Sequence, residues 1–269
     1  MVIIVICGRE NISMTLVFTR GIVRKPSKNL QDGLTTSNLG KPDYIKAIKQ
    51  HSTYIKALKK CGMEIITLDS DERFPDSTFV EDTAVVNEDL AIITNLGAPS
   101  RRGEEREIKT VLERYFDIVK SIKNPGTLEG GDVLRIEDTY YVGLSTRTNE
   151  GGANQFKKIL KVYGYSCSIV PLINFLHLKS GVAYIGDNNL IVSGEFKDSP
   201  IFKDFNRIEV EPNEQYAANC IKVNNYILIA KGFKKLKKSV SSLGYEILEI
   251  DMSEFRKMDG GLSCLSLRF

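Results

Sequence analysis

One pattern of hydrophobic and polar positions repeats along the chain. Two short runs rich in β-branched and aromatic residues are joined by a turn of Asn, Asp, Glu or Gly, which predicts a β-hairpin. Copies begin near residues 81, 131, 181 and 218, and a last copy starts at Gly260, close to the end of the chain. Apolar residues at helical spacing predict helices between the copies, at residues 42–62, 103–116, 153–163 and 233–243. Pro42 is expected in the first turn of its helix, and strands are expected at residues 64–68, 166–170 and 246–250.

The repeat predicts an α/β fold of five ββαβ modules with pseudo-fivefold symmetry. Repeated units bury their hydrophobic faces against their neighbours, so we expect the modules to close into a five-bladed α/β-propeller. The terminal strand, residues 262–268, then needs a partner, and residues 15–19 are available. An ordinary mixed α/β sheet with chance similarity between hairpins is the alternative. We expect a single domain over residues 14–269, with residues 1–13 as an extension outside the core.

Composition narrows the classes of function. Lys and Arg number 37 against 34 Asp and Glu, so the net charge of +3 is too balanced to indicate nucleic acid or a membrane surface as a partner. The basic run at residues 234–238 is typical of a solvated helix face. No apolar stretch approaches the roughly 18 residues that a membrane span needs. With five cysteines, no CxxC pair and two histidines, we expect neither a disulfide framework nor a zinc site, and we expect a reducing, cytoplasmic location.

Among the cysteines, Cys264 has the context of a reactive thiol. It follows Asp259-Gly260-Gly261, where paired glycines allow the backbone to approach a ligand closely, whereas the other cysteines lie in apolar runs or at a helix end. A thiolate nucleophile needs a partner that exchanges protons. His51 lies on the apolar stripe of its predicted helix and is expected in the core, while His177 precedes the third hairpin. Position therefore favours Cys264 with His177, and a buried structural cysteine is the alternative.

Acidic residues gather at the equivalent edges of the first two hairpins. Asp76, Glu81 and Asp82 precede the first hairpin, and Glu129 and Asp132 precede the second. Turn and capping roles are the simpler reading. In a closed ring, however, these edges converge on the axis, and a pocket rich in carboxylates suits a planar cation such as guanidinium. Arg101 and Arg147, each typical of a surface arginine when taken alone, could then bind a substrate carboxylate.

Ten ordered motifs resemble those of a known family. From about Phe18 to the C-terminus, the chain resembles the dimethylarginine dimethylaminohydrolases of the guanidino-group modifying, or pentein, superfamily. The motifs occupy residues 30–35, 39–44, 74–77, 79–82, 97–102, 128–132, 147–149, 176–180, 216–220 and 259–269.

The resemblance implies hydrolysis of asymmetric dimethylarginine or monomethylarginine to citrulline and dimethylamine or methylamine. In such enzymes the cysteine, here Cys264, attacks the guanidinium carbon and forms a covalent thiouronium intermediate. The resemblance makes His177 the proton donor and then the activator of water, with Glu129 as its orienting partner. It places the guanidinium group on Asp82 and Glu81. It assigns the amino-acid end of the substrate to Leu34, Asp76, Arg101, Arg147 and the backbone near Met258. It implies no metal or organic cofactor and allows a homodimer.

Two electrostatic expectations follow from this mechanism. The positive charge of the substrate lowers the pKa of the thiol on binding, so Cys264 is expected to be a neutral thiol in the free enzyme. Neighbouring carboxylates should keep the pKa of His177 near or above its ordinary value of about 6.5.

Three other functions compete with this interpretation. An arginine deiminase has the same chemistry but usually carries an additional helical insertion, and the gaps between modules here are short. Agmatine has no carboxylate for Arg101 and Arg147 to bind. A non-catalytic propeller protein would be expected to have lost Cys264, His177 or the acids, and all of them are present.

Overall fold

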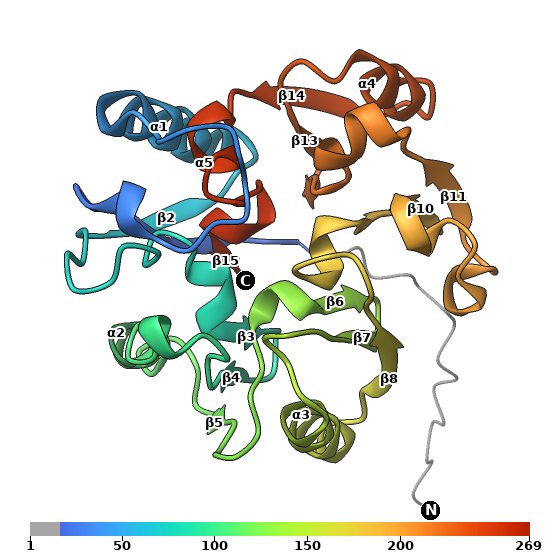
Figure 1. Ribbon diagram of the computed structural model, residues 1–269. Helices are drawn as coiled ribbons and strands as arrows, with labels where there is room; N and C mark the ends of the chain where they lie inside the picture. The colour runs from blue at the N-terminus through green and yellow to red at the C-terminus, as the bar shows by residue number, and fades with distance from the viewer. Residues whose placement is uncertain (1–16) are drawn as a thin grey trace, which may run out of the picture.

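The computed structural model describes residues 17–269, which form a ring of five three-stranded sheets (Figure 1). This architecture confirms the predicted α/β-propeller of five modules. Residues 1–16, including the predicted extension at residues 1–13, lie outside the described residues.

Every sheet has one antiparallel and one parallel pair of strands. In four of the sheets, the central strand pairs antiparallel with the strand before it through a tight hairpin, and parallel with a strand that returns after a crossover. Residues at the hairpin turns, such as Glu137, Asp187 and Asn224, have positive φ, as such turns require. Four sheets follow chain order: β3 (Ala84–Val86), β4 (Ala91–Ile93) and β5 (Val119–Ser121); β6 (Val133–Ile136), β7 (Thr139–Leu144) and β8 (Ser166–Pro171); β9 (Val182–Gly186), β10 (Asn189–Val192) and β11 (Asn206–Glu209); β12 (Ile221–Val223), β13 (Tyr226–Ala230) and β14 (Glu246–Ile250).

The fifth sheet closes the ring with both ends of the described chain. Strand β15 (Leu267–Arg268) pairs antiparallel with β1 (Arg20–Arg24), which pairs parallel with β2 (Glu64–Leu68). The predicted partner segment, residues 15–19, was therefore wrong by several residues, because Ile22 and Val23 supply the fully buried side chains of this sheet. The predicted strand 262–268 was too long, since Ser263–Leu265 forms a 3-10 turn instead.

Helices cover the outside of the ring at the predicted places. They are α1 (Tyr44–Lys60), α2 (Glu105–Leu112), α3 (Glu150–Val162) and α4 (Lys234–Ser241) (Figure 1). A short helix that was not predicted, α5 (Ser253–Arg256), lies inward of α1 and contacts it. Asp43 caps α1 by accepting from the Lys46 amide at 2.8 Å, so Pro42 precedes the cap rather than lying in the first turn. Helix α3 begins earlier than predicted because Asn149 caps it in the same way. Two 3-10 turns, η6 (Gly194–Phe196) and η7 (Pro200–Phe202), replace a helix between β10 and β11.

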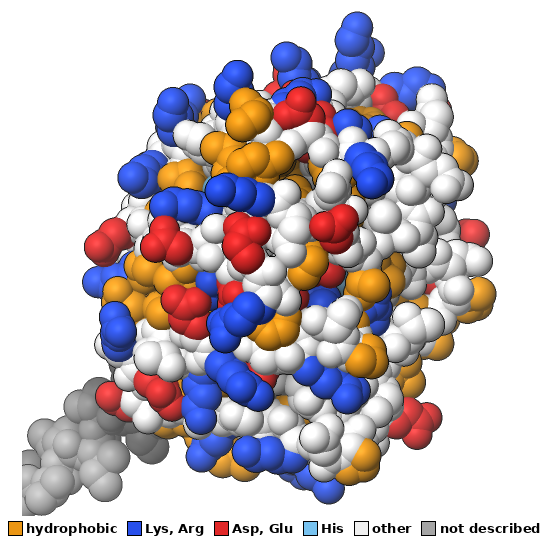
Figure 2. Space-filling model, turned by 60° about the vertical axis from the view of Figure 1, so that its left-hand side comes forward, with side chains coloured by type: hydrophobic (Ala, Val, Ile, Leu, Met, Phe, Trp, Pro, Cys, Tyr) orange, Lys and Arg blue, Asp and Glu red, His pale blue; other side chains and the backbone are white. Residues whose placement is uncertain are grey.

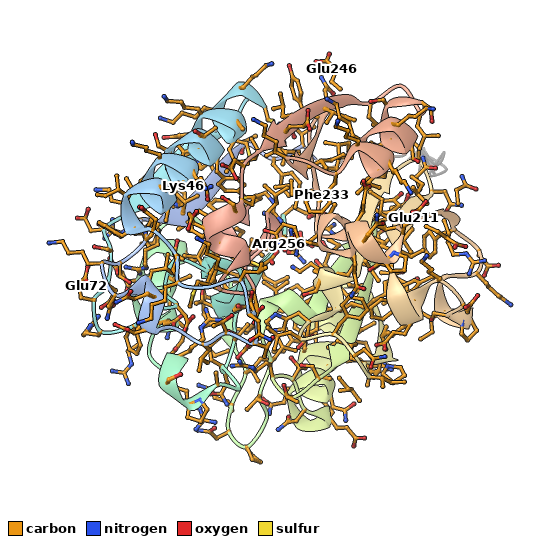
Figure 3. The ribbon with its side chains drawn as sticks, turned by 45° about the horizontal axis from the view of Figure 1, so that its top comes forward. Lys46, Glu72, Glu211, Phe233, Glu246 and Arg256 are labelled. Atoms are coloured by element: carbon orange, nitrogen blue, oxygen red, sulfur yellow. The ribbon has the colours of Figure 1, made fainter. Side chains whose placement is uncertain are left out.

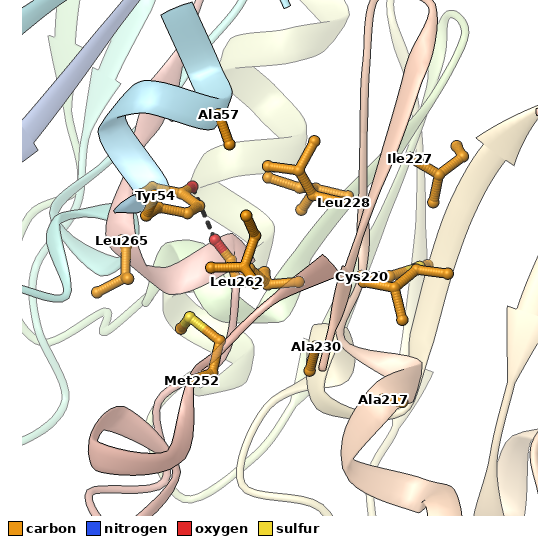
Figure 4. Packing of buried hydrophobic residues seen from close by; sticks show 14 of the residues in the cluster. Tyr54, Ala57, Ala217, Cys220, Ile227, Leu228, Ala230, Met252, Leu262 and Leu265 are labelled. Carbon is orange, nitrogen blue, oxygen red and sulfur yellow. Dashed lines mark hydrogen bonds between the residues drawn. The ribbon is translucent and has the colours of Figure 1, made fainter. Parts of the chain in front are cut away.

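The largest part of the core lies between α1, the β12–β14 sheet and the C-terminal segment, where Tyr54, Leu228 and Leu262 pack together (Figure 4). His51 is buried as predicted and lies beside Phe255, and burial lowers its pKa to about 4.

On the face shown in Figure 2, Lys and Arg are interspersed with Asp and Glu. In the basic run, Lys235 and Lys237 pair with Glu211 and Glu249, as expected of a solvated face. Across residues 17–269, no helix combines the length and apolar character needed to cross a membrane.

Candidate active site

Five 3-10 turns bring the functional side chains together around the axis of the ring. One such turn precedes the first strand of every sheet: η2 (Val80–Thr83), η4 (Gly130–Asp132), η5 (Leu178–Ser180), η8 (Pro212–Ala218) and η9 (Ser263–Leu265). Turn η2 contacts both η4 and η9, η4 contacts η5, and η5 contacts η8. The hairpin edges therefore converge as the repeat predicted.

A pocket opens at this convergence. Nine of the ten predicted site residues line it, and Glu81 does not. The lining residues are Leu34, Asp76, Phe79, Asp82, Arg101, Glu129, Arg147, Leu176, His177, Met258, Asp259, Gly260 and Cys264.

His177 and Glu129 form a buried hydrogen-bonded pair. His177 Nε2 lies 2.8 Å from Glu129 Oε2, and Asp82 Oδ1 lies 3.9 Å away. The other oxygen of Glu129 accepts from the amides of Gly97 and Ala98, which fixes the carboxylate. Burial alone would lower the pKa of His177, but the surrounding carboxylates outweigh burial and raise it to about 9. Burial alone would raise the pKa of Glu129, but the hydrogen bond to His177 lowers it. The imidazole is thus held in its protonated form, in agreement with the expected direction of the pKa shift.

Asp82 binds the guanidinium group of Arg101, another residue of the pocket. Its Oδ2 accepts from Arg101 Nη1 at 2.6 Å, and its Oδ1 accepts from the Gly131 amide at 2.9 Å. Burial alone would raise the pKa of Asp82, but the charges of His177 and Arg101 lower it to about 2. The geometry shows that this carboxylate can bind a guanidinium group.

The sequence analysis did not anticipate Glu104, the second partner of Arg101. Glu104 accepts from Arg101 Nε and Nη2, and the Phe79 carbonyl accepts from Nη2 as well. Burial raises the pKa of Glu104 to about 7, although Arg101 opposes that shift. Glu104 follows Arg101 by three residues, and this spacing was the signal in the sequence that could have identified the ion pair.

Cys264 lies in η9, and its Sγ accepts from the Gly261 amide at 3.3 Å. Turn η9 is anchored from α1, because the Tyr54 hydroxyl donates to the Leu262 carbonyl at 2.8 Å (Figure 4). Burial and the nearby charges of Glu81 and Asp82 raise the pKa of the Cys264 thiol to about 12. This shift agrees with the expectation of a neutral thiol in the free enzyme.

The loop after β1 closes one side of the pocket. The Leu34 amide donates to both oxygens of Asp76 at 3.1 Å. The Thr36 amide donates to Asp259 at 2.5 Å, which ties this loop to the segment before Cys264. Arg147 lies at the pocket wall, with its Nη1 3.9 Å from Glu129 Oε1. Asp259 begins the C-terminal motif, residues 259–269, but was not predicted as a site residue.

Glu81 departs from its predicted place. One of its oxygens accepts from Lys179 Nζ and the other from Ser263 Oγ, each at 2.6 Å. Neighbouring side chains of a 3-10 turn point in different directions, so Asp82 faces the pocket while Glu81 faces η5 and η9. The structure therefore does not support direct contact between Glu81 and a bound guanidinium group.

Asp82, Glu129 and His177 approach the geometry of a metal site, because one donor atom of each lies within 4.8 Å of the others. These atoms are already bonded to protein donors, Arg101 and Gly131 among them, and the imidazole is paired with Glu129. We therefore assign none of the three as a metal ligand.

Comparisons of the sequence and of the structure with known proteins point to the same family. Residues 37–196 match the family model described as eukaryotic N,N dimethylarginine dimethylhydrolase. An N(G),N(G)-dimethylarginine dimethylaminohydrolase from Pseudomonas aeruginosa is 49% identical over 94% of this chain and 100% of its own length.

Two solved structures of such enzymes superimpose on this chain with a TM-score of 0.93 at 48% identity, covering 94% of this chain and 100% of theirs. One is a histidine-to-glycine variant as an adduct with S-methyl-L-thiocitrulline. The other is a cysteine-to-serine variant from Pseudomonas aeruginosa complexed with citrulline.

Proposed function

The chain belongs to the dimethylarginine dimethylaminohydrolase family, and we propose that its central pocket hydrolyses asymmetric dimethylarginine and monomethylarginine to citrulline and the corresponding methylamine. The observation that carries the proposal is the joint placement of Cys264, the His177–Glu129 pair and Asp82 around one pocket. The relatives with bound citrulline or a thiocitrulline adduct were altered at a cysteine and at a histidine, which supports these roles.

In the first half of the reaction, Cys264 is the nucleophile. The substrate guanidinium lies against Asp82 and Glu129, and its positive charge favours loss of the thiol proton to solvent, which leaves the thiolate. Each oxygen of Asp82 accepts one hydrogen bond from the protein, which leaves a lone pair on each oxygen for the substrate. Sγ attacks the guanidinium carbon to give a tetrahedral adduct. His177 then donates its proton to the departing amine, and a thiouronium remains on Cys264.

In the second half, His177 acts as a base. It has lost its proton to the amine, so it can take one from a water molecule that attacks the thiouronium carbon. Collapse of that adduct forms the carbonyl group and breaks the carbon–sulfur bond. The hydroxyl proton passes to the leaving sulfur, which regenerates the Cys264 thiol and releases citrulline. Glu129 keeps the imidazole oriented throughout, because both of its oxygens are held by hydrogen bonds.

The amino-acid end of the substrate lies toward Arg147, Asp76 and the Leu34 loop. Arg147 makes only a 3.9 Å ion pair, whereas the guanidinium of Arg101 bonds to Asp82, Glu104 and Phe79. We therefore assign the α-carboxylate chiefly to Arg147 and the α-amino group to Asp76. Arg101 lies beside them and holds Asp82 in place.

The test is citrulline formation from asymmetric dimethylarginine, monomethylarginine and arginine, each assayed separately. Wild type should act on the methylated substrates, and Cys264→Ser should abolish turnover. Cys167→Ser is the matched control, since Cys167 lies in β8 outside the pocket. Citrulline from arginine alone would make the protein a deiminase, and no citrulline from any substrate would favour a non-catalytic binding protein.

We also propose a cytoplasmic location, because a nucleophilic thiol must stay reduced. Cys61, Cys167, Cys220 and Cys264 are free thiols, which supports this proposal. Fractionation of the native source measures the location, and recovery from an oxidising compartment would contradict it. Sedimentation of the same protein measures whether it forms the homodimer that the family resemblance allows.

A further inference from the structure

The position of Cys264 depends on its neighbour Ser263. The Ser263 amide donates to Asn219 Oδ1 at 2.9 Å, and Asn219 Nδ2 donates to Ser263 Oγ at 3.0 Å. Ser263 Oγ in turn donates to Glu81 Oε2 at 2.6 Å. Since Ser263 and Cys264 are consecutive residues of one short turn, these bonds orient the nucleophile as well.

Another contact holds the segment just before this turn. The Tyr216 hydroxyl donates to the Gly260 carbonyl at 2.8 Å. Arg256 lies over the rings of Tyr216 and Phe233, at 4.9 and 5.6 Å from their centroids, and Figure 3 shows Arg256 and Phe233 on neighbouring elements near the axis. Tyr216 thus holds the backbone before the turn at Gly260, whereas Ser263, within the turn, is held by Asn219 and by the charged residue Glu81.

Glu81 needs a counter-charge to serve as this anchor. It is 4% exposed, so its negative charge is withdrawn from water. Lys179 Nζ donates to Glu81 Oε1 at 2.6 Å, and Arg268 lies further away, at 3.6 Å. Lys179 follows His177 by two residues, and its carbonyl accepts from Asn219 Nδ2. The segment from His177 to Lys179 thus carries both the proton donor and the partner of Glu81.

We propose that Lys179 is a positioning residue for the nucleophile. By compensating the charge of Glu81, it maintains the Glu81–Ser263 hydrogen bond that orients Cys264, and it offsets a carboxylate that would otherwise oppose the thiolate. The inference rests on the proposed function, in which Cys264 attacks the substrate. Other charged or titratable groups that share the pocket or the surroundings of the thiol include Asp82 from η2, His177 just before η5, Tyr216 from η8 and Asp259, while Arg268 from β15 lies beside Glu81.

The test measures the rate at which iodoacetamide alkylates Cys264 at pH 8.5, with the modified peptide identified by mass spectrometry. Because the pKa of the thiol lies well above this pH, the rate is proportional to the thiolate fraction and falls about tenfold for each unit by which that pKa rises. We expect Lys179→Met to slow alkylation about tenfold and to lower kcat by a similar factor, while KM changes less. Lys179→Arg should stay within about threefold of wild type on both measures, because it keeps the charge.

Matched variants separate this role from a merely structural one. Lys237→Met removes an ion pair with Glu249 on the outer helix α4 and should behave as wild type. In a Glu81→Gln background the charge to be offset is gone, so Lys179→Met should have little further effect on alkylation. The proposal is overturned if Lys179→Met alkylates like wild type, or if it slows alkylation equally in both backgrounds. If Lys179→Met fails to fold, Lys179→Arg decides, because a tenfold loss of alkylation with the positive charge retained would overturn the proposal.

Alkylation needs no substrate, so the two proposals fail separately. A wild-type protein that forms no citrulline would contradict the proposed function, whatever the alkylation rates. Unchanged alkylation in an active Lys179→Met enzyme would contradict the positioning role alone.

Discussion

At the scale of single residues, Asp82 holds a negative charge that faces the pocket. It is buried, and the charges of His177 and Arg101 keep it ionised. We expect Asp82→Asn to lower kcat/KM by about 10²–10³-fold, because the amide cannot balance a cationic substrate or support a charged His177. The measurement is steady-state citrulline formation, with circular dichroism to verify folding.

Asp69→Asn is the control for this substitution. Asp69 pairs with Lys25 at the surface, where the same change should leave turnover unaltered. Turnover in Asp82→Asn equal to that of the control would remove Asp82 from the guanidinium site.

The pKa of His177 makes a prediction about stability. Because its pKa is raised to about 9 in the folded protein, its charge stabilises the fold fully below about pH 6.5, and this contribution is lost as pH rises through 9. Relative to His177→Gln, the free energy of unfolding of wild type should therefore fall by about 1–3 kcal/mol between pH 6.5 and pH 9. Urea unfolding of both proteins at several pH values measures this difference. A difference between the two proteins that is constant with pH would show that His177 does not titrate in this range.

At the scale of elements, the close packing of the 3-10 turns is what brings Asp82 and Glu129 together. A Cβ added at Gly130, in η4, would lie 1.9 Å from the Glu81 carbonyl oxygen and 3.1 Å from that of Ala84. These are backbone atoms, so η2 and η4 would have to separate. We expect Gly130→Ala to cost at least about 2 kcal/mol of stability and most of the activity, as measured by thermal unfolding and citrulline formation.

Gly151→Ala, in helix α3, is the matched change. Its added Cβ would meet a side-chain oxygen at 3.3 Å, and alanine favours a helix, so stability should stay within about 1 kcal/mol of wild type. If the two variants were equally stable and equally active, close packing of η2 against η4 would not determine the geometry of the site.

At the scale of the whole molecule, the strand that closes the ring and Cys264 lie in one C-terminal segment. Strand β15 follows η9 directly, and the Phe269 carbonyl accepts from the amides of Thr19 and Arg20. A chain that ends at Ser266 loses this pairing. We expect it to unfold at least about 5 °C lower and to lose activity, because Cys264 is then no longer anchored on its C-terminal side.

A chain that begins at Met14 is the opposite truncation. The sequence predicts residues 1–13 to lie outside the core, so this chain should keep both its melting temperature and its turnover. Calorimetry and the citrulline assay compare the two truncations. A large loss in the chain starting at Met14 would contradict the predicted domain boundary.

The sequence by itself determined the features that arise locally. Apolar alternation and Asn, Asp or Gly turns specify hairpins, and apolar residues at helical spacing specify helices, because both depend on neighbours a few residues apart. The fivefold repetition of these units was enough to predict the ring. It was also enough to predict that Cys264, His177 and the acids meet at its axis, since they occupy equivalent places in the repeat.

The tertiary structure alone decided how these groups are paired. Glu81 turns to Lys179 and Ser263 and away from the pocket, and Arg101 is bound to Asp82 and Glu104. The raised pKa of His177 and the strand that closes the ring depend likewise on residues far apart in the chain. Electrostatic energies and hydrogen bonds change over fractions of an ångström, whereas a pattern of residue types specifies only which elements form.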